Sequence, residues 1–153
     1  MNINDERPVL VYDGTCGFCT FWVRKWQHIT EDRLVYKASQ EVASNYPQIP
    51  EEKFDSSMFL ICPDGSYFSG AKGVFKALAI STTKIPLWAY EKVPGFAPIS
   101  ELIYSRIAKN RRIFNLLTRW NWGNSIDRPS WQLARTLLLI FLIFLSLVYF
   151  ITF

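Results

Sequence analysis

The chain has 153 residues, of which half are hydrophobic, so it fits one globular domain and is not disordered throughout. Only three cysteines are present, which excludes a framework of structural disulfides. The formal charge of +4 is unevenly distributed: residues 106–135 hold seven Lys or Arg and a single acid. No groove-reading motif accompanies these basic residues, so we expect no nucleic-acid partner. The first seven residues include two acids and no apolar run, which predicts no secretory signal.

Short apolar runs alternate with helical patterns in the first half of the chain. Residues 9–12 form a β-branched and aromatic run that is typical of a buried strand, and residues 34–36 form a second. Between them, apolar residues at helical spacing predict a helix over residues 16–28. A short helix over residues 39–46 is expected next, capped by Ser39 and ended by Pro47 and Pro50.

The second half begins with a predicted β-hairpin. Residues 58–62 form a third apolar strand, and the turn over residues 63–66 leads into a fourth at residues 67–68. A helix over residues 71–80 should present Val74, Phe75, Leu78 and Ala79 as its apolar face. Residues 86–98 are expected to form an irregular connection, followed by a basic amphipathic helix, or two helices, over residues 99–117. The order β-α-β-α-β-β-α predicts an α/β fold of the thioredoxin-like type with additional C-terminal helices.

The C-terminal segment has the properties of a membrane anchor. Residues 136–153 contain no charge, and as a helix they would cover roughly 27 Å, close to the thickness of a thin bilayer. The basic residues before it predict a single-pass cell-membrane protein whose globular part faces the cytoplasm, with lipid as a partner. We therefore expect a redox domain over residues 1–118, a basic linker over 119–132 and a transmembrane helix over 133–153.

The reactive centre is expected at a Cys-x-x-Cys pair, Cys16 and Cys19, where the first predicted strand meets the first predicted helix. Backbone N–H groups and the helix dipole lower the pKa of a thiol at such a helix N-terminus. Disulfide exchange needs one accessible thiolate and a second thiol close enough to release the mixed disulfide. We therefore expect Cys16 to attack and Cys19 to resolve.

Other polar residues admit a structural role beside a chemical one. Asp13 could transfer protons to or from the cysteine pair, or it could simply form an Asx turn that orients the loop. Gly14 should permit a positive φ or a close backbone approach. We expect Cys62 to be an inert core thiol and His28 to lie at the end of a helix, where its charge favours the dipole.

The segment Tyr-Asp-Gly-Thr-Cys-Gly-Phe-Cys at residues 12–19 closely resembles the signature of the DCC family of predicted thiol-disulfide oxidoreductases. Residues 64–65 with 69–71, and residues 103–111, resemble further elements of this family. The resemblance covers roughly residues 8–115 and implies a thioredoxin-like fold and protein-disulfide oxidoreductase activity carried by Cys16 and Cys19, with Asp13 beside them. Unlike thioredoxins, which keep a cis-proline facing the disulfide, this chain has Asp-Ser-Ser before the third strand.

The sequence thus predicts an enzyme that reduces or exchanges disulfides at the membrane surface. Its partners would be a protein or small-molecule disulfide and an electron donor or acceptor that the sequence does not identify; we expect no cofactor and no metal. One alternative is a zinc- or copper-binding module that uses Cys16 and Cys19, which stoichiometric metal in the reduced protein would favour. Another is a non-catalytic membrane scaffold, which would function normally with both cysteines changed to alanine.

Overall fold

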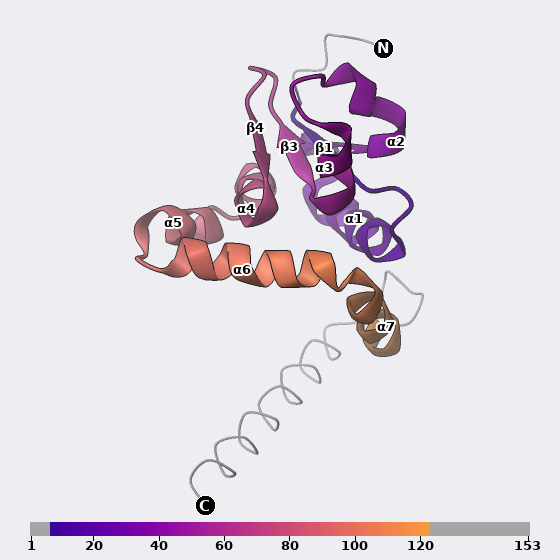
Figure 1. Ribbon diagram of the computed structural model, residues 1–153. Helices are drawn as coiled ribbons and strands as arrows, with labels where there is room; N and C mark the ends of the chain where they lie inside the picture. Colours follow the sequence, from indigo (N-terminus) through magenta and orange to yellow (C-terminus); the bar gives the residue numbers. More distant parts are fainter. Residues whose placement is uncertain (1–6, 123–153) are drawn as a thin grey trace, which may run out of the picture. The chain divides into compact units, whose positions relative to one another are not determined.

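The computed structural model describes residues 7–122, and Figure 1 shows the arrangement of its helices and strands. The elements in chain order are β1 (Val9–Tyr12), α1 (Gly17–Thr30), a 3₁₀ turn (Glu31–Arg33), β2 (Val35–Ala38), α2 (Ser39–Val42), a second 3₁₀ turn (Ala43–Asn45), α3 (Glu51–Ser56), β3 (Phe59–Ile61), β4 (Tyr67–Ser69), α4 (Gly70–Ser81), α5 (Ile85–Lys92), α6 (Phe96–Lys109) and α7 (Arg111–Trp122). The chain divides into two units, residues 1–114 and 115–153, and the sheet lies in the first.

The sheet has four strands in the order β2-β1-β3-β4. β1 runs parallel to β2, with Val9 opposite Val35, and antiparallel to β3, with Val11 opposite Phe59. β3 and β4 form the predicted antiparallel hairpin, in which Gly65 has a φ of 82°. The predicted order of the four strands is therefore confirmed, and this mixed α/β architecture is compatible with a thioredoxin-like fold.

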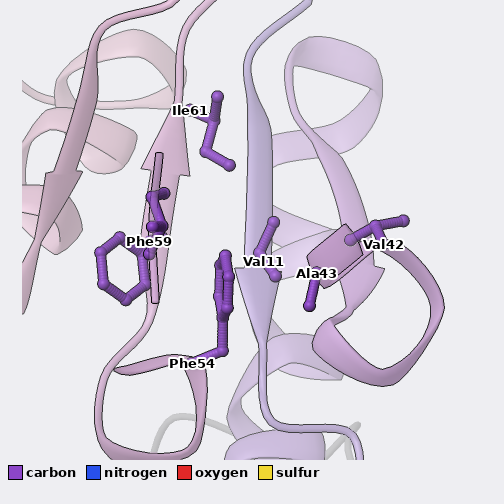
Figure 2. Close-up of a cluster of buried hydrophobic side chains, with 7 residues drawn as sticks. Val11, Val42, Ala43, Phe54, Phe59 and Ile61 are labelled. Atoms are coloured by element: carbon purple, nitrogen blue, oxygen red, sulfur yellow. The ribbon is translucent and has the colours of Figure 1, made fainter. Parts of the chain in front are cut away.

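Alternate residues of the central strands bury opposite faces of the sheet, as the pleat requires. Leu10 and Leu60 pack on one face against α1 and α4, in a cluster that includes Val23 and Ala77. On the other face, the core cluster shown in Figure 2 joins β1 and β3 to α2 and α3; its members are Val11, Val42, Ala43, Ile49, Phe54, Phe59 and Ile61. Because α1 packs on the first face and α2 on the second, the helices that follow β1 and β2 lie on opposite sides of the sheet.

The predicted apolar face of the helix over residues 71–80 is wrong. Its buried residues are small ones on a different face of α4, among them Gly73 and Ala77. A Cβ atom on Gly73 would lie 2.7 Å from the carbonyl oxygen of Phe68, so only a glycine permits this close approach to the hairpin. Phe75 instead packs against the next two helices: its ring centroid lies 5.9 Å from that of Tyr90 and 6.0 Å from that of Phe96.

Two further expectations are corrected by helices that contain or follow prolines. The segment over residues 86–98 is not irregular, because it forms α5 and the start of α6. Pro86 and Pro98 fall in the first turns of these helices, where the missing N–H has no intrahelical acceptor to lose. Likewise Pro50 precedes a helix, α3, that the sequence did not indicate.

The short helix expected over residues 39–46 also differs. It is divided into α2 and a 3₁₀ turn, and Ser39 is its first helical residue rather than its cap, because β2 extends directly to Ala38. The basic segment over residues 99–117 was expected to form one helix or two. It lies in two helices, α6 and α7, which meet at Asn110.

None of the helices between residues 7 and 122 is long and apolar enough to cross a bilayer. The predicted transmembrane helix over residues 133–153 lies outside the described residues.

Candidate functional site

The two cysteines lie where β1 leads into α1, at the carboxyl edge of the parallel strand pair. Cys16 is the N-cap of α1, so the helix begins one residue later than predicted. Its sulfur accepts a hydrogen bond from the backbone N–H of Cys19, over 3.3 Å between sulfur and nitrogen. Cys16 is half-buried, whereas Cys19 is only 5% exposed, and both are free thiols. A disulfide partner can therefore reach Cys16 far more readily than Cys19.

The environment of Cys19 keeps this thiol protonated. Burial raises the pKa of Cys19 to about 12, assisted by a hydrogen bond with the Cys16 side chain and by the negative charge of Asp13. The positive charge of Arg111 opposes these effects without overcoming them. At neutral pH the Cys19 thiol therefore keeps its proton.

Asp13 organises the loop that precedes the cysteines. Its Oδ1 accepts hydrogen bonds from the backbone N–H of Thr15 (2.9 Å) and from the Thr15 hydroxyl (2.7 Å), which forms the predicted Asx turn. The same oxygen accepts a bond from the Gln40 side-chain amide, over 3.2 Å. The carbonyl of Asp13 accepts a further bond from the N–H of Cys16, so the turn leads directly into this cysteine.

The second carboxylate oxygen of Asp13 binds a cation from far along the chain. The guanidinium of Arg111, at the start of α7, lies 3.3 Å from Oδ2, and both side chains are about 85% buried from solvent, with exposed fractions of 15% for Arg111 and 13% for Asp13. Burial raises the pKa of Asp13, but the hydrogen bonds from Thr15 and Gln40 and the charge of Arg111 outweigh it. The pKa of Asp13 is therefore held below its ordinary value of 3.8.

Gln40, the second residue of α2, connects the loop before the cysteines to the helix that follows the neighbouring strand. Its carbonyl oxygen accepts the backbone N–H of Gly14 over 3.0 Å, while its amide nitrogen donates to Asp13. A Cβ atom on Gly14 would lie 2.8 Å from the Cβ of Ala38 and 2.9 Å from the Gln40 oxygen. Of the two explanations expected for Gly14, the close approach is confirmed, and a positive φ is not observed.

Polar side chains of α6 fix the start of β3 and of α4. The hydroxyl of Tyr104 accepts the backbone N–H of Met58 (3.0 Å), at the position before β3. Both carboxylate oxygens of Glu101 accept backbone N–H groups of α4, from Ala71 and Lys72, each over 3.1 Å. Asn110 follows the last residue of α6, and its carbonyl accepts the N–H groups of Ile113 and Phe114 in the first turn of α7, which begins at Arg111.

A comparison with protein-family models matches residues 10–116 to the family described as DCC1-like thiol-disulfide oxidoreductase. The chain belongs to this family. The match extends from β1 to the first half of α7, so it includes the cysteine pair, Asp13 and Arg111. Searches of curated proteins and of solved structures gave no significant match.

The remaining sequence candidates lie away from the cysteine pair of this DCC1-like chain. Cys62 follows β3 at the end of the sheet opposite to Cys16, since β3 runs antiparallel to β1. It is half-buried and lines a separate hollow of about 500 Å³ rather than the core. His28 is exposed in the last turn of α1. Within residues 7–122, no three His, Cys, Asp or Glu side chains are grouped as metal ligands.

Two residues that contact Asp13 were not singled out from the sequence. Gln40 lies two residues after the end of β2, the strand parallel to β1, so the edge shared by the two parallel strands could have indicated it. Arg111 lies within the segment that resembles the family, but nothing local indicates that it reaches a residue 98 positions earlier.

We predict that Asp13→Asn lowers the free energy of unfolding by about 1–3 kcal/mol at neutral pH, because it removes the charge from a hydrogen-bonded ion pair. Since folding depresses the Asp13 pKa, this stabilisation is present above the unfolded value of 3.8 and is lost as the pH falls through the folded value. Urea unfolding of both proteins between pH 7 and pH 2.5 measures the difference.

Asp64→Asn is the matched control. Asp64 makes the same local bonds, to the N–H and hydroxyl of Ser66 two residues later, but within the described residues no bond joins it to a distant segment. It should cause a much smaller loss. Equal losses in the two variants would contradict a special role for the contacts with Gln40 and Arg111.

Proposed function

We propose that this DCC1-like chain reduces or exchanges disulfides in other proteins, with Cys16 as the nucleophile and Cys19 as the resolving thiol. The observation that carries the proposal is the contrast between the two sulfurs. The sulfur of Cys16 is accessible and accepts an N–H at the start of a helix, while the thiol of Cys19 is buried one turn later and stays protonated. This is the arrangement that stepwise thiol-disulfide exchange requires.

The reaction would proceed in two exchanges. The Cys16 thiolate attacks one sulfur of the substrate disulfide, forms a mixed disulfide and releases the other substrate sulfur as a thiolate that takes up a proton. Cys19 then loses its proton and attacks the sulfur of Cys16. This forms the Cys16–Cys19 disulfide and releases the second substrate thiolate. Two electrons pass from the pair to the substrate, and an external thiol or dithiol must reduce the pair again.

The buried thiol needs a proton acceptor in the second exchange. Asp13 is the proposed acceptor or relay, because its carboxylate acts electrostatically on Cys19 and is ionised at neutral pH. In the cytoplasm the glutathione poise of roughly −220 to −320 mV would keep the pair reduced, so reduction of substrates is favoured over net oxidation.

We predict that Cys16→Ser abolishes the protein's ability to catalyse the reduction of insulin disulfides with dithiothreitol as the electron donor. Cys62→Ser should retain this ability. The reason is that Cys62 lies at the opposite end of the sheet. Cys19→Ala should accumulate a mixed disulfide on Cys16, because the resolving thiol is absent. Turbidity measures insulin reduction, and non-reducing electrophoresis with mass spectrometry identifies the trapped disulfide.

Insulin reduction that survives in Cys16→Ser would show that the nucleophile is assigned wrongly. Stoichiometric zinc or copper in the reduced wild-type protein, lost in Cys16→Ser, would instead favour the metal-binding alternative.

We also propose that residues 133–153 anchor this activity to a membrane, with the redox domain in the cytoplasm. The support is the charge-free run over residues 136–153 together with the basic residues that precede it. Substrates would then be proteins that expose disulfides near the membrane surface.

The full chain is predicted to sediment with membranes and to resist extraction with alkaline carbonate, whereas a chain that ends at residue 132 should appear in the supernatant. Immunoblotting of the two fractions measures this. Full-length protein in the carbonate supernatant would contradict the anchor.

A further inference from the structure

The first turn of α7 lies against the segment that carries the cysteine pair. Phe18, one of the two residues between Cys16 and Cys19, packs on Phe114 of α7, with the ring centroids 6.3 Å apart. Arg111 begins the same turn of α7, three residues before Phe114. All of these residues belong to the first unit of the chain. One helical turn therefore brings both an aromatic ring and a positive charge to the loop that holds the cysteines.

The guanidinium of Arg111 is held by two acceptors of different kinds. It lies 3.3 Å from Oδ2 of Asp13, and it donates a hydrogen bond of 2.8 Å to the backbone carbonyl of Asp55. A carboxylate loses its charge when it takes up a proton, whereas a backbone carbonyl does not titrate and remains an acceptor. The bond to Asp55 would therefore keep Arg111 in place after Asp13 had been protonated.

The charges of Arg111 and Asp13 act on the Cys19 thiol in opposite directions. Burial is the main reason that the pKa of Cys19 is raised to about 12, but Arg111 lowers this pKa and Asp13 raises it. Arg111 is only 15% exposed, so solvent screens its charge weakly. Cys16 also acts on Cys19, but it no longer titrates once it is part of a mixed disulfide. If Asp13 then takes up the proton of Cys19, the new thiolate faces the positive charge of Arg111 alone.

We propose that Arg111 is a positioning residue for the second exchange, in which it holds the Asp13 carboxylate and stabilises the Cys19 thiolate. The inference rests on the proposed function and adds a residue to it. In this step the proton passes from the Cys19 sulfur to Asp13, and the thiolate forms a bond to the sulfur of Cys16. The bond between Cys16 and the substrate sulfur breaks, and the substrate thiolate leaves with its electron pair. Arg111 keeps all of its own protons throughout.

The test follows the two exchanges separately in the full-length protein in detergent, with Cys62→Ser as the background. Reduced protein is mixed in a stopped-flow instrument with one equivalent of an aromatic disulfide whose released thiolate absorbs visible light. Attack by Cys16 should release the first thiolate in a phase whose rate rises with concentration. Attack by Cys19 on the mixed disulfide should release the second in a phase whose rate does not depend on concentration.

We expect Arg111→Gln to slow the second phase roughly tenfold, which corresponds to about one unit in the pKa of Cys19, and to change the first phase much less. The variant should also need a higher pH than the parent protein to reach the same rate in the second phase. Arg111→Lys should recover most of the lost rate, because it keeps the positive charge. A purely structural role would not shift the pH dependence of the second phase alone.

Arg112→Gln is the matched control, because Arg112 is the next residue of α7 and is exposed. It should leave both phases unchanged. Absence of the second phase from the parent protein would overturn the proposed function itself. A second phase that is unchanged in Arg111→Gln would overturn only the role of Arg111. If circular dichroism shows that Arg111→Gln does not fold, a folded Arg111→Lys protein without the second phase would overturn that role equally.

Discussion

The rest of the site depends on the hydrogen bonds and the ion pair that the carboxylate of Asp13 forms. It accepts bonds from its own loop, from the helix after the neighbouring strand and from an arginine 98 residues later. Because these bonds hold the loop between β1 and α1 in one conformation, they also determine where the helix begins and which cysteine becomes its N-cap. A charge that is buried and paired in this way is costly to disturb, since the partners it leaves would be unsatisfied.

As a consequence, the thiols of Cys16 and Cys19, which are chemically identical and only three residues apart, have different surroundings. The sulfur at the N-cap accepts a backbone N–H and is partly exposed to solvent, while the cysteine on the first turn is buried. Arg111 contributes a positive charge that acts on the buried thiol, and Asp13 contributes a negative one. The roles proposed for Cys16 and Cys19 follow from this asymmetry rather than from the Cys-x-x-Cys spacing alone.

Local patterns in the sequence were sufficient for the strands, for the hairpin around Gly65 and for the placement of the cysteine pair at a strand–helix junction. These patterns were not sufficient where contacts between segments far apart in the sequence determine the structure. The buried face of α4 consists of small residues because Gly73 approaches the carbonyl of Phe68, which no periodicity of large apolar residues can reveal. Prolines do not mark a break at α5, because the first turn of a helix tolerates them. The contacts of Gln40 and Arg111 with Asp13 require the tertiary fold.

The proposed activity requires Cys16 and Cys19 to form one reversible two-electron couple. The most direct measurement equilibrates the full-length protein in glutathione buffers of graded potential, alkylates the free thiols and maps them by mass spectrometry. We expect a single transition in which Cys16 and Cys19 lose their labels together, through a disulfide between them, while Cys62 stays labelled. A disulfide that includes Cys62, or two cysteines that never join under oxidising conditions, would contradict it.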